Sequence, residues 1–352
     1  MTTRCVASCG VGPVISEPQT EASRDVGHPT AHAGGARTTD FSLVVGVDHY
    51  PRFRSLNGAI ADAERFHAWL RDPKGGDIAK GNAHKVLSKA EPISPLQDEV
   101  DEELLEIIRA ADALGGGHRL YFHFSGHGAG SLGKRDDEDV ALLLAKWSLS
   151  LARLALSKDE YNGVLRGMGL FDEIVISLDC CRAAARGAVG LPPTITHEPR
   201  TPPRHTRTFI AYATEEGQTT FETRDGNLWS GVFTNCLLEI LRSAPHGIIA
   251  ADLKRELEYA MESRGQRAYI VNGLEDSSRF GHQGTLPRLL VRFVRAVFPV
   301  CLRNGMRSVI ARCDQSTPKW ELLLEPGLYK LEGSDGSAVT FEHTAKGTHV
   351  AL

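Results

Sequence analysis

Two short apolar stretches, each stopped by residues that cannot continue a strand, constrain the fold most. The first is Arg119–Phe124, followed by Ser125-Gly-His-Gly128, and the second is Asp172–Leu178, followed by Asp179-Cys-Cys-Arg182. Both are rich in β-branched and aromatic residues, which favours buried strands. Ligands bind beyond the carboxyl ends of the strands in an open parallel sheet. The sequence therefore predicts that an imidazole and a thiol meet at one edge of a sheet.

The rest of the central region alternates between strand and helix patterns. We expect further strands at 41–47, 83–87, 140–145, 207–214 and 267–271, and helices at 58–70, 95–114, 157–168, 231–242 and 249–264. Such alternation implies right-handed crossovers. The predicted class is α/β, with a mainly parallel, doubly wound sheet and helices on both faces, over residues 40–286.

The two ends of the chain differ from this centre. Residues 1–39 are rich in Gly, Pro, Thr, Ser and Ala without apolar periodicity, which predicts a disordered leader. Residues 287–352 hold short strand-like runs separated by turn signals such as Asn304-Gly and Pro326-Gly. They predict a small β-rich C-terminal domain.

Composition excludes several classes of protein. Of 352 residues, 41% are hydrophobic and 24% charged, which allows a sizeable core. The net charge is −4, with 40 basic and 44 acidic residues, which argues against nucleic-acid or membrane partners for the chain as a whole. No apolar run has the length of a membrane span, and the first residues lack the apolar core of a signal peptide. We expect a soluble, cytoplasmic protein.

The seven cysteines are odd in number and irregularly spaced, which suits a reducing compartment. Cys5 and Cys9 have the spacing of half a metal site, but no second ligand pair lies nearby. No structural metal is expected.

Cys181 and His127 are the candidate nucleophile and proton partner. A thiol attacks as the thiolate, so it requires a nearby cation, helix N-terminus or histidine. Glycines flank His127 and allow close approach of a substrate backbone. The N–H groups of Gly128 and Cys181 are the candidate oxyanion donors. The alternative is a buried structural cysteine beside a loop histidine with satisfied hydrogen bonds.

Cys180 complicates the assignment, because it adjoins Cys181. Side chains alternate along a strand, so the two thiols should face opposite ways. One thiol then belongs to the core and the other to the site.

The order of the motifs adds a resemblance. The sequence resembles the caspase and metacaspase superfamily of cysteine proteases over residues 41–272, in its prokaryotic-type, basic-specific branch. The matching segments are Leu43–Tyr50, Leu56–Ala63, Phe122–Gly128, Ile174–Arg182 and Ser230–Leu238. The resemblance implies a caspase-like fold, with Cys181 as nucleophile and Cys180 as the small residue before it. It assigns the catalytic histidine to His127 rather than His123.

The same resemblance implies a substrate-binding role for Asp62, Ser125 and Asp179. In metacaspase-like proteins, the corresponding residues form an acidic pocket for Arg or Lys before the cut bond. Two carboxylates and a hydroxyl can hold a guanidinium by charge-assisted hydrogen bonds. Without the resemblance, each carboxylate would be interpreted as a helix-surface or turn residue. The implied function is an endopeptidase that cleaves protein or peptide substrates after Arg, with Lys as the alternative, in a death or defence pathway.

Two features depart from the resemblance or leave it open. Arg182 follows the cysteine where metacaspases often have His. Asp136–Asp139 is acidic enough to suggest calcium, but it lacks the spacing and glycine of a calcium loop. We expect no cofactor, with calcium as the alternative.

The stretch 183–206 is Pro-rich and basic, and it predicts a flexible linker between a large and a small segment. Arg186, Arg200 and Arg204 are candidate processing positions, cut by the enzyme itself or by an upstream activating protease. The alternative is a passive connection. For the whole chain, the alternatives are a catalytically inactive caspase-like binding module and an esterase or thiol transferase on a similar sheet.

Overall fold

The computed structural model describes residues 39–130, 139–185, 187–196, 204–226, 228–244, 246–281, 287–305, 307, 309–324, 326–344 and 346–352. Its helices are α1 (Ala59–Arg71), α2 (Gln97–Ala113), α3 (Lys158–Met168), α4 (Val232–Ser243) and α5 (Ala250–Glu262), with a 3₁₀ turn at Lys80–Asn82. The strands before residue 282 are β1 (Asp40–Gly46), β2 (Ala83–Leu87), β3 (Gly117–Ser125), β4 (Gly128–Gly130), β5 (Val140–Leu143), β6 (Ala155–Ser157), β7 (Phe171–Asp179), β8 (Arg207–Tyr212), β9 (Glu222–Asp225), β10 (Leu228–Gly231), β11 (Ile248–Ile249), β12 (Tyr269–Asn272) and β13 (Arg279–Phe280). The later strands are β14 (Arg288–Arg292), β15 (Val300–Asn304), β16 (Val309–Cys313), β17 (Lys319–Leu323), β18 (Gly327–Gly333), β19 (Ala338–His343) and β20 (Thr348–Ala351).

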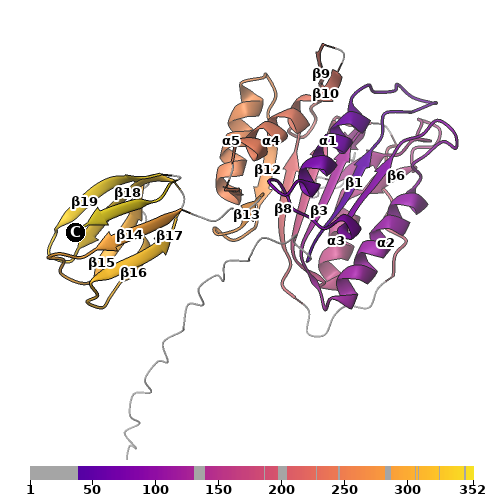
Figure 1. The fold of residues 1–352 in the computed structure, drawn as a ribbon. Helices are drawn as coiled ribbons and strands as arrows, with labels where there is room; N and C mark the ends of the chain where they lie inside the picture. The colour runs from indigo at the N-terminus through magenta and orange to yellow at the C-terminus, as the bar shows by residue number, and fades with distance from the viewer. Residues whose placement is uncertain are drawn as a thin grey trace, which may run out of the picture. The chain divides into compact units, whose positions relative to one another are not determined.

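A six-stranded sheet with the order β12-β8-β7-β3-β1-β2 forms the centre of the fold (Figure 1). Strands β2, β1, β3, β7 and β8 are parallel, and β12 runs antiparallel at one edge. One apolar core lies between the sheet and α2 and α3, and a second lies between the sheet and α1, α4 and α5. The predicted doubly wound α/β class is confirmed.

The central strands β3 and β7 are apolar on both faces. Phe122 and Phe124 of β3 lie in the core under α2 and α3, whereas Tyr121 lies in the core under α1, α4 and α5. Strands buried on both faces read as continuous apolar runs, which is why the sequence marked these two so clearly. Ser125 and Asp179 are register partners at their carboxyl ends, and paired residues of parallel strands face the same side of the sheet.

Two small sheets lie beside the carboxyl ends of β3 and β7. Strands β4, β5 and β6 form one, and the antiparallel hairpin β9–β10 forms the other. The short strand expected near residue 140 is present as β5. The hairpin β9–β10 was not predicted from the sequence.

Part of the segment after the nucleophile, 183–206, contacts the rest of the domain. Leu191 donates its N–H to the Ala155 carbonyl at 2.8 Å. Thr194 donates from its backbone N–H and its hydroxyl to the Asp101 carboxylate, at 2.9 and 2.7 Å. Within this segment, the described stretch 187–196 is therefore tied to β6 and α2. Asp101, a buried carboxylate on α2, provides the acceptors for Thr194. The composition of 183–206 gives no sign of this distant partner.

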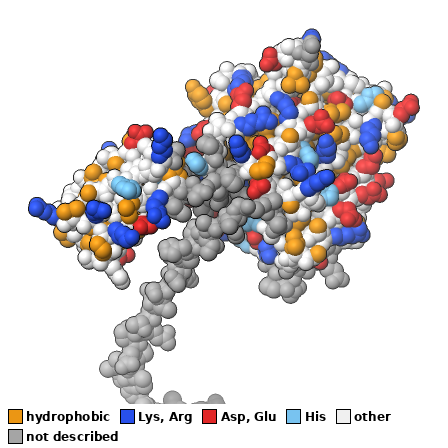
Figure 2. All heavy atoms as spheres, viewed as in Figure 1, with side chains coloured by type: hydrophobic (Ala, Val, Ile, Leu, Met, Phe, Trp, Pro, Cys, Tyr) orange, Lys and Arg blue, Asp and Glu red, His pale blue; other side chains and the backbone are white. Residues whose placement is uncertain are grey.

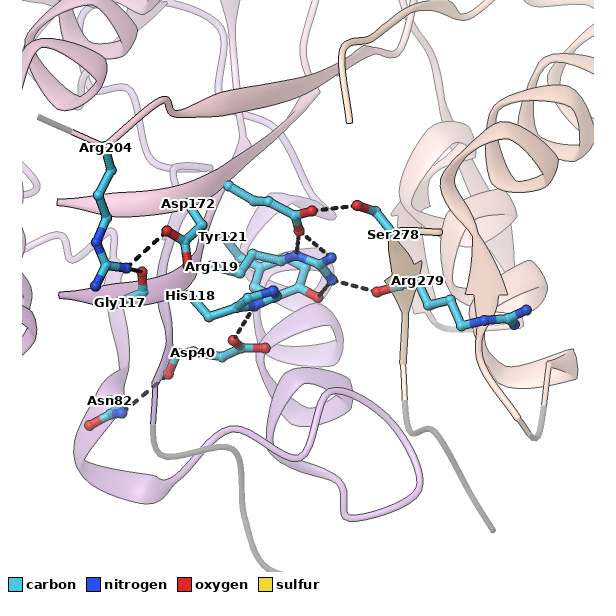
Figure 3. A network of polar contacts seen from close by, with 11 residues as sticks. Asp40, Asn82, Gly117, His118, Arg119, Tyr121, Asp172, Arg204, Ser278 and Arg279 are labelled. Atoms are coloured by element: carbon cyan, nitrogen blue, oxygen red, sulfur yellow. Dashed lines mark hydrogen bonds and ion pairs between the residues drawn. The ribbon is translucent and has the colours of Figure 1, made fainter. Parts of the chain in front are cut away.

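A buried polar network lies at the amino ends of β3 and β7 (Figure 3). The Arg119 guanidinium, 1% exposed, forms an ion pair with Glu173 and donates to the Arg279 carbonyl at 2.6 Å. Ser278 donates to the same carboxylate. The network thus ties the segment before residue 282 to the central sheet.

Strands β14–β20 form two sheets, with the orders β17-β14-β20 and β16-β15-β18-β19. Their shared core contains Leu289, Val291, Val300, Leu302, Tyr329 and Leu331. Acidic and basic side chains are interspersed on the face of the molecule in Figure 2, as a nearly balanced charge suggests. Within the described residues, no helix combines the length and the apolarity needed to cross a bilayer.

Candidate active site

The two cysteines after β7 face different environments. Cys180 is 1% exposed and belongs to the core under α2 and α3, whereas Cys181 is partly exposed. The strand alternation that leads to Asp179 continues through this turn, so it separates the thiols as expected. Cys181 is the thiol that a substrate could reach.

Gly128 brings the first motif against the second. A Cβ atom on Gly128 would lie 2.5 Å from the Cys181 carbonyl oxygen and 2.6 Å from the Cys180 Sγ, so only glycine fits there. Leu143 donates its N–H to the His127 carbonyl, which makes Gly128 and its partner on β5 a non-hydrogen-bonded pair. The Gly128 N–H therefore points away from β5. The geometry allows this amide and that of Cys181 to serve as oxyanion donors.

Aromatic rings and backbone groups fix the His127 imidazole. Its ring centroid lies 4.8 Å from that of Tyr50 and 5.0 Å from that of Phe53. Its Nε2 lies 2.6 Å from the Arg54 carbonyl oxygen. A carbonyl only accepts, so Nε2 carries the proton and Nδ1 is left as the basic nitrogen.

Tyr50 also holds the backbone of this turn. Its hydroxyl accepts the His127 N–H at 2.9 Å and donates to the Leu143 carbonyl at 3.1 Å. The buried phenol thus bridges two backbone groups, one just before β4 and one at the end of β5. Through this hydrogen bond and its ring contact, Tyr50 fixes the position of His127.

The thiol contacts a segment that precedes the hairpin β9–β10. The Thr220 N–H donates to the Cys181 Sγ at 3.4 Å, and the thiol donates to the Thr220 carbonyl at 3.9 Å. Burial raises the pKa of Cys181, and Asp179 raises it further, while the Thr220 amide opposes both effects. Burial lowers the pKa of His127. Both shifts favour the neutral forms of the thiol and the imidazole.

Asp62 and Asp179, the acidic pair, come together from α1 and β7. The Asp179 Oδ2 accepts the Thr234 N–H and hydroxyl at 3.0 and 2.7 Å. Asp62 accepts the Gly231 N–H at 2.7 Å and pairs with Arg65. A side chain on Gly231 would overlap the Asp179 carboxylate. Because Gly231 lies between the two acids and has no side chain, Asp62 and Asp179 can lie close together.

Burial raises the pKa of both members of the acidic pair, and the charge of Asp179 raises that of Asp62 further. Ser125 is buried beside Asp179 on the same face of the sheet. The structure thus brings the three predicted substrate-binding residues together at the carboxyl ends of β3 and β7. Two buried carboxylates face one arginine, Arg65, and this arrangement can accept a further cation.

Arg182, which departs from the resemblance, points into the protein. Its guanidinium lies 4.3 Å from the Tyr212 ring and 5.4 Å from the Tyr269 ring, and it donates to the Thr214 carbonyl at 3.3 Å. It packs the turn after the nucleophile on β8 and β12. Its role is in packing rather than in the exposed site.

Sequence reasoning missed Tyr50, Thr220 and Glu222 as site residues. Tyr50 lies within the first matching segment, which was the only signal for it. Thr220 and Glu222 lie in a polar stretch without periodicity, and their contacts are with residues far away in the sequence. No local pattern marks them.

The processing and metal candidates are placed only in part. Arg204 donates to Asp172 at 2.9 Å and to the carbonyls of Gly117 and Gly115 at 3.2 and 3.0 Å (Figure 3). A protease that recognises this side chain must first detach it. Arg186 and Arg200 lie outside the described residues.

The acidic run at 136–138 and the cysteines at 5 and 9 also lie outside the described residues. Asp139 is described, and it accepts from the Ser157 hydroxyl at 2.8 Å. Within the part of the chain that the structure describes, no three His, Cys, Asp or Glu side chains are grouped as metal ligands.

A histidine and a thiol thus follow adjacent parallel strands of an α/β sheet, the arrangement expected of a cysteine peptidase of the predicted class. The chain belongs to the caspase family, because the family model described as "Caspase domain" matches residues 39–276. A probable protease from a Desulfuromonadales bacterium is 24% identical over 289 residues, which are 74% of this chain and 34% of that protein. The chain thus spans about a third of that relative. The crystal structure of caspase-1 from Spodoptera frugiperda is also similar, with a TM-score of 0.45 and 13% identity over 71% of this chain and 93% of that one.

Proposed function

We propose that this chain is a cysteine endopeptidase that cleaves after Arg, with Lys as the second choice. The observation that carries the proposal is the acidic pair, Asp62 and Asp179, buried beside the turn that presents Cys181. A buried negative charge of this kind favours a bound cation. A guanidinium can pair with both carboxylates at once and donate to the Ser125 hydroxyl.

The proposed reaction is acyl transfer through Cys181. The thiol proton passes to Nδ1 of His127 as sulfur attacks the carbonyl carbon of the peptide bond. The amides of Gly128 and Cys181 donate to the oxyanion. Collapse of the tetrahedral intermediate breaks the C–N bond, and the imidazolium gives its proton to the leaving amine. Water then attacks the thioester, the imidazole accepts its proton, and sulfur leaves.

The orientation of His127 supports this assignment. Its Nε2–H is used by the Arg54 carbonyl, so the nitrogen available for proton transfer is Nδ1. The carbonyl also stabilises the imidazolium that forms during the reaction, because it accepts from the charged ring. Arg54 therefore contributes its backbone rather than its side chain.

An irreversible peptide ketone carrying Arg at its reactive end tests the assignment. We expect mass spectrometry to find it on Cys181, and peptide-library profiling to give cuts after Arg that the Cys181→Ala variant lacks. A matched inhibitor carrying Asp should label poorly. Preference for Asp would refute the proposal. Absence of labelling in either case would favour the inactive binding module, and ester hydrolysis without peptide cleavage would favour the esterase.

We further propose that the chain is processed between residues 183 and 206, by itself or by an upstream protease, and that the pieces remain associated. The sheet supports the association, because β7 and β8 pair along their length on either side of this segment. Intact-mass measurement on wild type and Cys181→Ala distinguishes self-cutting from external cutting. Undiminished activity and no processing after replacing Arg186, Arg200 and Arg204 with Ala would make cleavage unnecessary.

A cofactor is not part of the proposed reaction. Parallel assays with EDTA and with added calcium test the alternative, and a loss of activity in EDTA that calcium restores would favour a calcium-dependent enzyme. A role in a regulated death or defence pathway is proposed from the family alone. Its test is whether expression of active protein, but not of Cys181→Ala, arrests or kills the host cell.

A further inference from the structure

Gln266 is a buried amide side chain that bonds to the segment in contact with the candidate nucleophile. It lies between α5 and β12, is 6% exposed, and donates its backbone N–H to the Met261 carbonyl at 3.0 Å. Its Oε1 accepts the Thr220 hydroxyl at 3.0 Å, across 46 positions of the chain. The backbone of Thr220 in turn contacts the Cys181 Sγ. Hydrogen bonds therefore connect the end of α5 to the thiol.

Little else fixes the position of Thr220. The preceding residues, 215–219, are exposed, and backbone hydrogen bonds join them to Arg182, the residue after the nucleophile. Within the described residues, the bond to Gln266 is the one hydrogen bond that the Thr220 side chain makes. Gln266 is thus the buried group that holds Thr220 in place beside the thiol.

Only one end of the Gln266 amide is hydrogen-bonded. Its Nε2 is buried and has no acceptor within the described part of the chain. A buried donor without a partner costs free energy, and an apolar side chain of the same length would avoid that cost. Local stability therefore does not account for a glutamine at this position. What the glutamine supplies is the acceptor for Thr220.

We infer that Gln266 is a positioning residue for the nucleophile: through the Thr220 hydroxyl, it holds the Thr220 amide against the sulfur of Cys181. The inference rests on Cys181 as the nucleophile of the proposed reaction. An N–H aimed at sulfur stabilises the thiolate that forms when His127 takes the proton, because it donates to the charged form. The same contact keeps the sulfur in one place while it attacks.

The ionisation of the thiol reports this contact. Among the described residues, the Thr220 amide lowers the pKa of Cys181, against burial and the charge of Asp179, which raise it. If Thr220 moves away, the pKa of the thiol should rise. The other titratable groups that interact with the thiol or with its proton partner His127 are Cys180, Glu222 and Arg54. All of them stay in place when Gln266 is replaced.

The Gln266→Met variant keeps the length of the side chain and removes the acceptor. We expect kcat/KM, with any peptide that the wild type cleaves, to fall about threefold to tenfold, the range for one hydrogen bond. Alkylation of Cys181 by iodoacetamide, read by tandem mass spectrometry that resolves it from Cys180, should move to higher pH. The midpoint of urea unfolding should stay the same or rise, because the unpartnered Nε2 is gone. The matched control is Arg267→Met, at an exposed neighbour in the same loop, which should leave all three unchanged.

The Thr220→Val variant tests whether Gln266 acts through the hydroxyl, because it removes that group and keeps the backbone amide. It should reproduce the alkylation shift by itself, and adding Gln266→Met should then change little. Full additivity of the two substitutions, or unchanged alkylation in Gln266→Met, would overturn the inference. A loss of stability with unchanged kcat/KM would do the same, since a purely structural role gives that result. If the wild type cleaves no peptide, the proposed function fails, while the alkylation measurement, which needs no substrate, still decides the positioning role.

Discussion

Replacing Asp179 with Asn should weaken cleavage after Arg by orders of magnitude and at the same time stabilise the fold. The Asp179 Oδ2 accepts two bonds from Thr234, and the oxygen of an Asn amide can accept the same two. The substitution preserves shape and removes one of two buried ionisable carboxyl groups. Asp179→Ala is a poorer test, because it leaves the buried Thr234 donors without their acceptor.

The magnitude of the functional loss follows from the pairing lost by the substrate cation. Breaking one partner of a buried ion pair costs about 3–5 kcal/mol. Because 1.4 kcal/mol is a factor of ten, kcat/KM for an Arg peptide should fall by about 10²-fold to 4 × 10³-fold. Peptides ending in Arg, Lys, Asp and Leu, assayed in parallel, show whether the loss is specific to basic residues.

The stability change has the opposite sign and depends on pH. Burial, and to a smaller extent the charge of Glu222, raise the pKa of Asp179 in the folded state above its unfolded value. The folded carboxyl therefore favours its proton, and its ionisation weakens the fold as pH rises from the unfolded pKa through the folded one. The pKa of Asp179 rises from 3.8 to about 6 and one pKa unit is about 1.4 kcal/mol, so Asp179→Asn should gain up to about 3 kcal/mol at pH 7.5 and little below about pH 4.

Urea unfolding in a Cys181→Ala background measures this gain without self-cutting, and Asp225→Asn, which changes an exposed carboxylate on β9, serves as the control. If Asp179→Asn still cleaves after Arg at the wild-type rate, the substrate-binding role is wrong. If it is less stable than wild type at pH 7.5, the acidic pair does not repel as the structure implies.

Three further outcomes are expected. Cys181→Ala should lose all peptide cleavage while Cys180→Ala keeps most of it, by fluorogenic assay; the reverse result would move the nucleophile by one residue. Tyr50→Phe removes a hydroxyl that bridges two buried backbone groups, so it should cost about 1–3 kcal/mol in urea unfolding and lower kcat; an unchanged kcat would contradict its positioning of the histidine. Arg119→Met leaves Glu173 buried without its cation and should cost about 3–5 kcal/mol, more than the double replacement of both by Met; equal losses would show that the pair itself is not the cause.

The sequence predicted the centre of the site because the relevant information is local. Strands β3 and β7 are continuous apolar runs, and each ends at a motif. Their parallel register then places Ser125 beside Asp179 without further assumptions. The separation of Cys180 from Cys181 follows from the alternation of side chains along the same strand.

The sequence did not reveal the hairpin β9–β10, for a physical reason. Strand β9 is polar and mostly exposed, and β10 (Leu228–Gly231) is too short to show an alternating pattern. What holds the hairpin is the contact of Glu222 with Asn57 and Gly58, across 165 and 164 positions of the chain. A contact of that separation is a property of the packed fold. Thr220, which lies two residues before Glu222, was missed with it.

The sequence also did not reveal how the surroundings shift the pKa of the Cys181 thiol. This shift connects the choice of substrate with ionisation of the nucleophile. Motif reasoning expects a thiol with a lowered pKa, but burial and the charge of Asp179 both raise the pKa of Cys181. A guanidinium bound to Asp179 would offset that charge, so a basic substrate should ease ionisation of the thiol that attacks it. Small guanidinium compounds such as agmatine should therefore shift the alkylation of Cys181 by iodoacetamide to lower pH. The shift should be absent in Asp179→Asn and with an uncharged butylamide of matched length. An agmatine effect that persists in Asp179→Asn would show that the charge of this residue does not govern the thiol.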